Sequence, residues 1–341
     1  MTDRGFASDN AAGVHPAVLD AITRANEGHA FGYGRDDWTH RAEELLREQF
    51  GSDVQPFLVW GGTGANVLSL RAICRPWEAA IWADCAHLNV DEAGAPEAIA
   101  GVELLDLATE HGKLTPTMVE RAIVRVGDQH VVQPRVASVS EATELGTVYS
   151  REEVTALADT THANGLVLHM DGARLSNAAA AIGCSLRDLS AEAGVDALSF
   201  GGTKNGLLGA EVIVFLKPEL AEGFVYLRKQ SLQLASKMRF LAAQIEALLH
   251  DELWRSLAAH ANAMAAGLAA AISELPGVRV THPVESNAVF ATLPRQAIEA
   301  LRAQFAFYVW DEARDEVRWM CSWDTTEDDI ERLVSAARAV L

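Results

Sequence analysis

The chain has 341 residues, of which 49% are hydrophobic and 22% are charged, and its 47 acidic side chains outnumber 28 basic ones to give a formal net charge of −19. This length suffices for two domains, or for one large α/β domain with an appendage. The composition excludes a disordered segment or a membrane protein, and the negative charge disfavours nucleic acid and anionic membrane surfaces as partners.

The start of the chain makes a cytoplasmic protein the default expectation. Residues 1–5 lack the basic and then apolar run of a secretory signal, and no window has the apolar length that a bilayer requires. The cysteines lie far apart without Cys-x-x-Cys spacing, which predicts free, packed thiols rather than disulfides or a zinc ribbon. They are Cys74, Cys85, Cys184 and Cys321.

Residues 1–50 are expected to form an N-terminal arm with two helices. Apolar positions recur at helical spacing over residues 16–25 and 38–50. A glycine-rich loop at residues 28–34 separates the two segments.

Residues 51–254 are predicted to form a large α/β domain. Short apolar runs alternate here with amphipathic segments, which include a helix from Gly64 and another over residues 152–163. Such alternation predicts a mostly parallel sheet with helices on both faces. The expected strands are at residues 57–60, 80–82, 101–105, 131–139, 166–169, 197–200 and 210–215.

Residues 255–341 are predicted to form a smaller α+β domain. Nearly continuous helix-forming sequence over residues 221–272 leads into it. A last helix opens at Thr326, where acidic residues complement the N-terminal dipole. The expected strands are at residues 277–281, 288–292, 307–310 and 317–321.

Three features at strand ends point to one ligand site. The glycine-rich turn at residues 61–66 precedes a helix, so its N–H groups can hold an anion. Asp171 and Lys204 each follow a predicted strand. Taken singly, the glycine-rich turn is more often only a tight turn, and a lone lysine is more often a surface lysine. Asp171 could also form a pair with Arg174 that closes a loop. Open α/β sheets bind ligands where strands end, and this favours convergence of the three.

Pyridoxal 5′-phosphate is a cofactor that uses all three features. It needs an amine for its Schiff base, a carboxylate at its pyridine nitrogen, and N–H donors for its phosphate. The sequence also contains a series of recognisable motifs. They are Ser8-Asp9-Asn10, Tyr33-Gly34-x-Asp36, Gly62-Thr63-Gly64-x-Asn66, His87-x-x-x-Asp91-Glu92-x-Gly94-Ala95, Thr143-x-x-Gly146-Thr147, His169-x-Asp171-Gly172-Ala173-Arg174-Leu175 and Thr203-Lys204. With these motifs the chain resembles, end to end, the threonine aldolase branch of the β-eliminating lyase family, among the aspartate aminotransferase-like (fold type I) enzymes.

The resemblance implies a role for each matching residue. Lys204 would carry the Schiff base, Asp171 would hold the pyridine nitrogen, and His87 would stack on the ring. Further cofactor contacts are implied at Gly62, Thr63, Gly64, Arg174 and Thr203. The substrate carboxylate would be bound by Ser8, Arg174 and Arg318, and Tyr33 would reach the site of a neighbouring subunit.

One position departs from the family pattern. Threonine aldolases often carry a histidine after the threonine that corresponds to Thr143, and this chain has Glu144 there. The base that takes the substrate's hydroxyl proton therefore has three candidates. Glu144 takes it, His87 takes it through a water, or the segment only shapes the pocket.

The resemblance implies an aldolase that cleaves L-threonine, L-allo-threonine or phenylserine reversibly to glycine and an aldehyde. It also implies a homo-oligomer, with a tetramer favoured. The alternatives are another β-eliminating lyase that acts on an aromatic or sulfur-containing amino acid, and a non-catalytic assembly protein of the same fold. No metal is expected, because the 11 histidines include no zinc-binding spacing.

Overall fold

Two β-sheets organise the computed structural model, which describes residues 4–341. The larger sheet has seven strands in the order β1-β7-β6-β5-β4-β2-β3. These strands are β1 (Gln55–Val59), β2 (Glu78–Ala83), β3 (Glu103–Leu107), β4 (Gln133–Ser140), β5 (Val167–Gly172), β6 (Ala197–Gly201) and β7 (Glu211–Phe215). Only β7 runs antiparallel to its neighbours, so the predicted mostly parallel sheet is confirmed.

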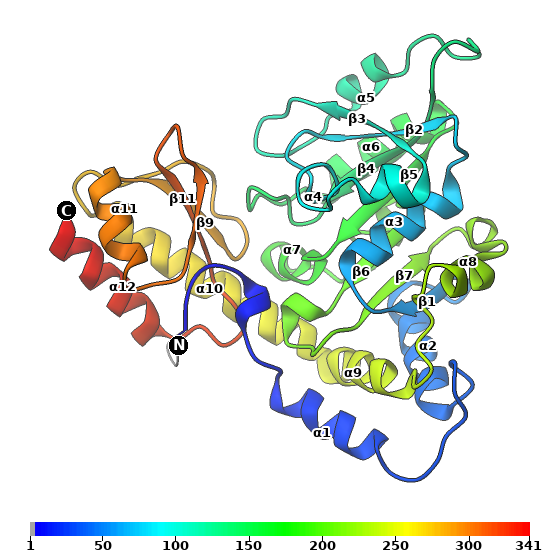
Figure 1. Ribbon diagram of the computed structural model, residues 1–341, viewed down its shortest axis with the longest axis horizontal. Helices are drawn as coiled ribbons and strands as arrows, with labels where there is room; N and C mark the ends of the chain where they lie inside the picture. The colour runs from blue at the N-terminus through cyan, green and yellow to red at the C-terminus, as the bar shows by residue number, and fades with distance from the viewer. Residues whose placement is uncertain (1–3) are drawn as a thin grey trace.

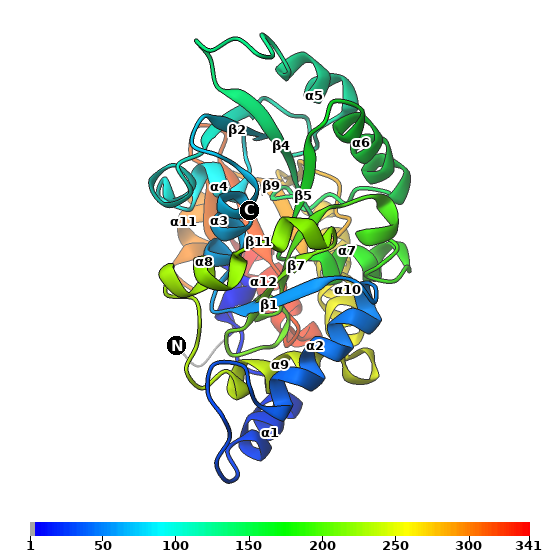
Figure 2. The same cartoon turned by 90° about the vertical axis from the view of Figure 1, so that its right-hand side faces the viewer.

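Helices cover both faces of this sheet, as Figure 2 shows. One face packs against α3 (Gly62–Ile73) and α8 (Phe224–Gln230), with Val136, Ile213 and Phe215 in the shared core. The other face has a larger core. Its covering helices are α1 (Pro16–Ala25), α2 (Asp37–Phe50), α5 (Pro116–Ala122), α6 (Arg151–Ala163), α7 (Leu175–Ile182) and α9 (Arg239–Leu249). Strands buried on both sides explain the nearly uniform apolar runs of β6 and β7.

The smaller sheet is antiparallel, in the order β10-β11-β9-β8, and forms a second layer at the left of Figure 1. Its strands are β8 (Arg279–Val280), β9 (Ala288–Thr292), β10 (Tyr308–Asp311) and β11 (Glu316–Met320). It has its own core together with α10 (Leu253–Ser273), α11 (Arg295–Arg302) and α12 (Glu327–Val340). The expected smaller α+β unit is therefore present.

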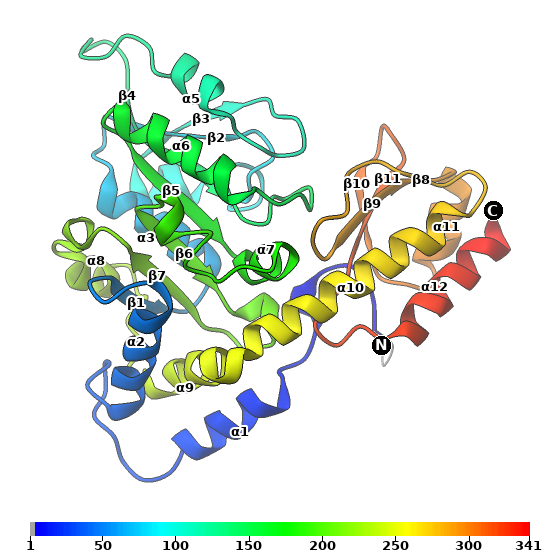
Figure 3. The ribbon, with the colours of Figure 1, turned by 180° about the vertical axis from the view of Figure 1, so that it is seen from behind.

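The bridging helical segment expected over residues 221–272 is present, but it is divided into three helices. The structure has α8, α9 and α10, with irregular residues after α8 and a kink between α9 and α10 (Figure 3). Leu232, Asp251 and Glu252 have φ between 49° and 64°, which a helix does not allow. Gln233 instead accepts a hydrogen bond from the backbone N–H of Trp60 at 3.0 Å. A tertiary contact of this kind overrides helix propensity and is invisible in a local pattern.

α10 joins the two parts of the chain. It packs against α7 beside the large sheet and against α12 and β9 in the smaller unit. The boundary predicted at residues 254–255 falls within this shared helix and stays a prediction. Among residues 4–341, no helix is long and apolar enough to cross a membrane. The four cysteines are free, as expected, and are buried or half-buried.

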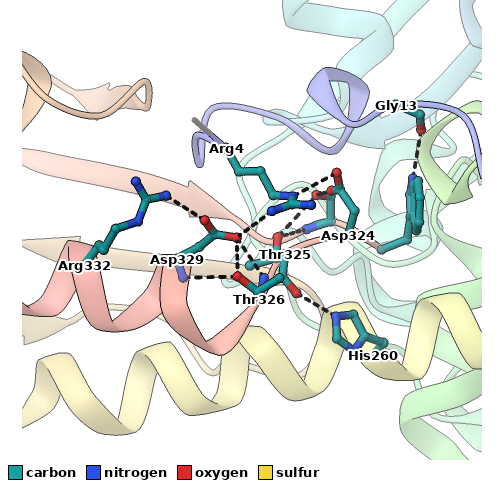
Figure 4. Close-up of polar contacts among 10 residues, drawn as sticks. Arg4, Gly13, His260, Asp324, Thr325, Thr326, Asp329 and Arg332 are labelled. Carbon is teal, nitrogen blue, oxygen red and sulfur yellow. Dashed lines mark hydrogen bonds and ion pairs between the residues drawn. The ribbon is translucent and has the colours of Figure 1, made fainter. Parts of the chain in front are cut away.

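The N-terminal segment is tied to the smaller unit. The N–H of Phe6 donates to the carbonyl of Ala306 at 2.7 Å, and its own carbonyl accepts from Met320 at 2.8 Å. The Phe6 ring is buried in the smaller core. Arg4 contacts Asp324 and Asp329 at the start of α12, as Figure 4 shows. These contacts bring the residues that follow to the space between the two sheets. Residues 1–3, part of the stretch searched for a secretory signal, lie outside the described residues.

Candidate active site

A cavity of about 690 Å³ lies between the two sheets. Its walls come from the N-terminal segment, from the loops after β2, β4, β5 and β6, and from β10 and β11. Many of the residues singled out in the sequence line it. They are Ser8, His87, Glu144, Asp171, Arg174, Lys204 and Arg318. The structure thus brings together side chains from positions as far apart in the sequence as Ser8 and Arg318.

Asp171 lies at the end of β5, a strand that is buried throughout. Its Oδ1 accepts the N–H of Ala173 at 3.0 Å, and its Oδ2 accepts the side-chain amide of Asn66 at 2.8 Å. Beneath it, burial lowers the pKa of His169 to about 4, and the ring bridges Ser138 and Ser199 on the neighbouring strands. His169 is therefore neutral at neutral pH, and its uncharged ring can both donate to and accept from the two serine hydroxyls. The carboxylate is therefore held by fixed donors at the edge of the cavity.

Lys204 follows β6 in a short 3₁₀ turn, Thr203–Asn205. Within residues 4–341 its amine has no hydrogen bond or ion pair. Burial lowers the pKa of Lys204, and the nearby charge of Arg174 lowers it further. A depressed pKa leaves more of the amine unprotonated and nucleophilic at neutral pH.

Two features hold the Lys204 turn in place. Glu211 on β7 accepts the N–H groups of Gly202 and Thr203 at 3.0 and 3.4 Å. Burial raises the pKa of Glu211 to about 7. A Cβ on Gly201 would lie 2.7 Å from the Cα of Ala173, so only glycine lets this turn approach the segment after Asp171 so closely.

His87 is joined to Asp171 through two side chains that the sequence analysis had not assigned. Nδ1 of His87 lies 2.9 Å from Oε1 of Glu92. The amide of Asn66 donates both to that oxygen, at 3.3 Å, and to Asp171. The hydrogen bond to Glu92 raises the pKa of His87, and burial opposes this.

Glu144 lies on the loop after β4, is half-buried and lines the cavity. Its Oε1 accepts the hydroxyl of Ser140 at 2.6 Å and the backbone N–H of His87 at 2.9 Å. Its Oε2 is buried without a hydrogen-bond partner in the described chain. Burial raises the pKa of Glu144. The carboxyl group therefore has one oxygen that no other group of residues 4–341 uses.

Two arginines supply positive charge to the cavity. Nε and Nη2 of Arg174 donate to the two carboxylate oxygens of Asp9 at 2.7 and 3.0 Å, which leaves Nη1 for another partner. Burial alone would raise the pKa of Asp9, but the charges of Arg174 and Lys204 hold it below its usual value. Arg318 lies against the rings of Tyr308 and Trp310, and its Nε is buried without a partner among residues 4–341. An anionic group between the two guanidinium groups would satisfy both.

The glycine-rich turn predicted to hold a phosphate begins α3. Gly61 precedes the helix without a side-chain cap, so the first N–H groups have no side-chain acceptor. Asn66 lies one turn along the helix and bonds Asp171, which sets the helix start near the site. Gly62, Thr63 and Gly64 are not among the residues that line the cavity, and neither is Thr203.

Tyr33 also lies outside the cavity. Its side chain is half exposed, and the amine of Lys229 lies 4.8 Å from the centre of its ring. Its predicted reach into a neighbouring subunit stays a prediction.

The residues present fit pyridoxal phosphate. An unpaired amine at Lys204 and a hydrogen-bonded carboxylate at Asp171 line one cavity, which is large enough for a flat heterocycle. The uncapped start of α3 offers N–H groups and a positive dipole end to a phosphate. The chemistry of this donor set matches the three needs of the cofactor.

Sequence analysis had missed the roles of several neighbours. The motifs include Asp9, Asn66 and Glu92, but no role was predicted for them. Local spacing does not show which side chains far along the chain they contact. For Asp9 the partner is Arg174, 165 positions away. The useful clue would have been that an arginine after a buried strand requires a carboxylate from elsewhere.

We expect Asp9→Ala to lower the free energy of unfolding by about 3–5 kcal/mol, because Arg174 would keep its buried charge without its partner. Urea denaturation monitored by tryptophan fluorescence measures the change. Asp128→Ala is the matched control, since the Arg125–Asp128 pair is exposed and its loss should change stability far less. Equal effects of the two substitutions would contradict the role given to the buried pair.

Known proteins resemble this chain over its whole length. A protein of Pseudomonas aeruginosa named low specificity L-threonine aldolase is 47% identical over 344 residues, which cover 100% of this chain and 98% of the relative. A solved threonine aldolase structure from Leishmania major has a TM-score of 0.94 at 32% identity and covers 99% of this chain and 100% of that one.

A solved aspartate aminotransferase variant from Thermus thermophilus has a TM-score of 0.73 at 17% identity and covers 97% of this chain and 94% of that one, which supports the fold type I expectation. The model of the beta-eliminating lyase family matches residues 5–295. The resemblance to threonine aldolases is confirmed, and the chain belongs to the beta-eliminating lyase family of pyridoxal-phosphate-dependent enzymes.

Proposed function

We propose that this protein is an aldolase that cleaves an L-β-hydroxy-α-amino acid reversibly to glycine and an aldehyde. The observation that carries the proposal is one cavity that contains an unpaired lysine amine, a fixed carboxylate and two arginines. The full-length similarity to a protein named low specificity L-threonine aldolase supports the same reaction. L-threonine, L-allo-threonine and phenylserine are the proposed substrates.

The two arginines and Ser8 would bind the substrate carboxylate. Arg174 and Arg318 line the same cavity, and a planar guanidinium fork suits two carboxylate oxygens. Holding the carboxylate fixes the rotation about the bond between Cα and the amino group. This selects the Cα–Cβ bond as the one that breaks.

Lys204 and Asp171 would hold the cofactor, which when bound supplies an electron sink for the charge left at Cα. Asp171 would keep a proton on the ring nitrogen, because its carboxylate is fixed by Asn66 and Ala173 and cannot turn away. Gly62, Thr63, Gly64 and Thr203 would contribute to phosphate binding.

Glu144 is the proposed acceptor of the hydroxyl proton. Its Oε1 is already used by two donors, whereas Oε2 is free of partners in the described chain. A general base needs an unoccupied oxygen within reach of the substrate and a pKa nearer the working pH than that of an ordinary carboxylate. Burial raises the pKa of Glu144 in that direction.

We also propose a cytoplasmic homotetramer. Free cysteines support a reducing compartment. Large apolar side chains are exposed around the N-terminal arm, where Phe31 is 74% exposed, and after α8, where Leu232 is 85% exposed. Large exposed apolar side chains such as these support burial against another copy.

The purified protein, saturated with pyridoxal phosphate and given each of the four threonine stereoisomers, should release glycine and acetaldehyde from the L-isomers. The substrate carboxylate is held by the arginines, and the proposed base, Glu144, lies on one side of the cavity. We therefore expect little release of glycine from the D-isomers. Amino-acid analysis and a coupled acetaldehyde assay measure the products. Release of ammonia and a keto acid in place of glycine would contradict the aldolase assignment and favour a β-eliminating lyase.

Lys204→Ala should abolish the visible absorbance of lysine-bound pyridoxal and nearly all turnover, because no other unpaired amine lines the cavity among residues 4–341. An absorbance spectrum and the glycine assay measure both effects. Lys237→Ala is the control, because Lys237 is exposed and lies outside the cavity. Retained turnover in the Lys204 variant would refute the assignment.

Glu144→Gln should lower kcat by about 10²–10⁴, the usual contribution of a general base. Glutamine preserves the shape and can still accept from Ser140 and His87, so the loss would report on the missing base. Because the pKa of Glu144 is raised, wild-type kcat/KM should increase as pH rises through that pKa, and the variant should lack this step. A variant with unchanged kcat would show that the segment only shapes the pocket.

A further inference from the structure

Glu92 is a buried carboxylate that none of the proposed chemical steps uses. It lies on the loop that follows α4 (His87–Val90), and its side chain is wholly inaccessible to solvent. A buried carboxylate is unfavourable unless fixed donors satisfy it. Its two partners are the amide of Asn66 and the ring of His87, both at Oε1. Its Oε2 has no partner in the described chain.

We propose that Glu92 is a positioning residue that holds the imidazole of His87 with its proton on Nδ1 and its Nε2 toward the cavity. The hydrogen bond of 2.9 Å between Nδ1 and Oε1 requires the hydrogen to lie on the nitrogen, since a carboxylate can only accept. In the neutral ring, Nε2 then carries the lone pair. His87 lines the cavity, and Nε2 has no hydrogen bond to any residue from 4 to 341.

Asn66 fixes the orientation of this carboxylate relative to Asp171. Its side-chain nitrogen carries two hydrogens, and it donates to one oxygen of Glu92 and to one oxygen of Asp171. The same amide therefore sets the positions of two carboxylates. One is that of Asp171, which is proposed to bind the pyridine nitrogen of the cofactor, and the other is that of Glu92, which contacts His87. Rotation of either carboxylate would break a hydrogen bond of the shared amide in a buried site, which is costly.

The arrangement parallels a carboxylate behind a catalytic histidine, in which the acid fixes the tautomer and stabilises the protonated ring. Several charges face His87. Glu92 and Asp171 favour the protonated ring, Lys204 opposes it, and Glu144 accepts the backbone N–H of His87. The hydrogen bond to Glu92 is the largest of these influences and raises the pKa of His87.

Deuterium exchange at the imidazole C2–H, followed by peptide mass spectrometry across a pH series, measures the pKa of His87 in the intact cofactor-loaded protein. In the wild type we expect it above that of an unperturbed histidine. Glu92→Gln keeps the shape but removes the charge, so the proton affinity of His87 should fall about tenfold or more. Glu97→Gln, an exposed glutamate of the same loop region, should leave it unchanged.

A wild-type His87 with an ordinary or lowered pKa would overturn the proposal, even if the Glu92 variant failed to fold. So would a Glu92→Gln protein whose His87 titrates like the wild type. Glu92→Asp, with its shorter side chain, should give an intermediate pKa if it folds. An equal loss of proton affinity in Glu97→Gln would show a general charge effect and would also overturn the proposal.

The consequence for catalysis rests on the proposed aldolase function. Because His87 lies in the cavity, kcat/KM for L-threonine should change as pH passes through the pKa of His87. In Glu92→Gln this change should occur at lower pH. A step that stays in place while the measured pKa of His87 falls would overturn this consequence. If L-threonine is not cleaved at all, the aldolase proposal fails, while the exchange experiment still tests the role of Glu92.

Discussion

The burial of charge at the ends of β4, β5 and β6 is the constraint on which the rest of the site depends. Asp171 ends a strand that is buried throughout, so its carboxylate must find donors that the protein fixes in advance. Asn66 on α3 and the N–H of Ala173 provide them. The same requirement recurs at Arg174, which is satisfied by Asp9.

Much of the fold followed from hydrophobic pattern alone. Short apolar runs alternating with helices gave the mostly parallel sheet, because strands covered on both faces need apolar side chains on both sides. The antiparallel β7 was not foreseen, since its sequence is as apolar as that of β6. The breaks in the segment 221–272 were also missed. They depend on backbone turns at Leu232 and Asp251 that tertiary packing imposes, and helix propensity does not report these.

The site was partly predictable for a different reason. Strand ends in a parallel sheet share one edge, so Asp171 and Lys204 could be expected to meet once their strands were assigned. Motif resemblance then gave Arg318 and Ser8 a role. The residues that support these side chains were not predictable, because hydrogen bonds such as that of Glu92 with Asn66 depend on how α3 lies across the sheet. Local sequence carries no information on that placement.

The attachment of Phe6 to β11 makes the residues that follow it, among them Ser8 and Asn10, part of the wall of the cavity. Ser8 and Asp9 reach the arginines only because that anchor holds. Deleting these residues would remove Phe6 from the core of the smaller unit and would also take away Ser8 and Asp9, which lie near the arginines of the cavity. For anyone redesigning the protein, affinity tags and fusions are therefore better placed at the far end, where α12 terminates beside Leu341 at the surface.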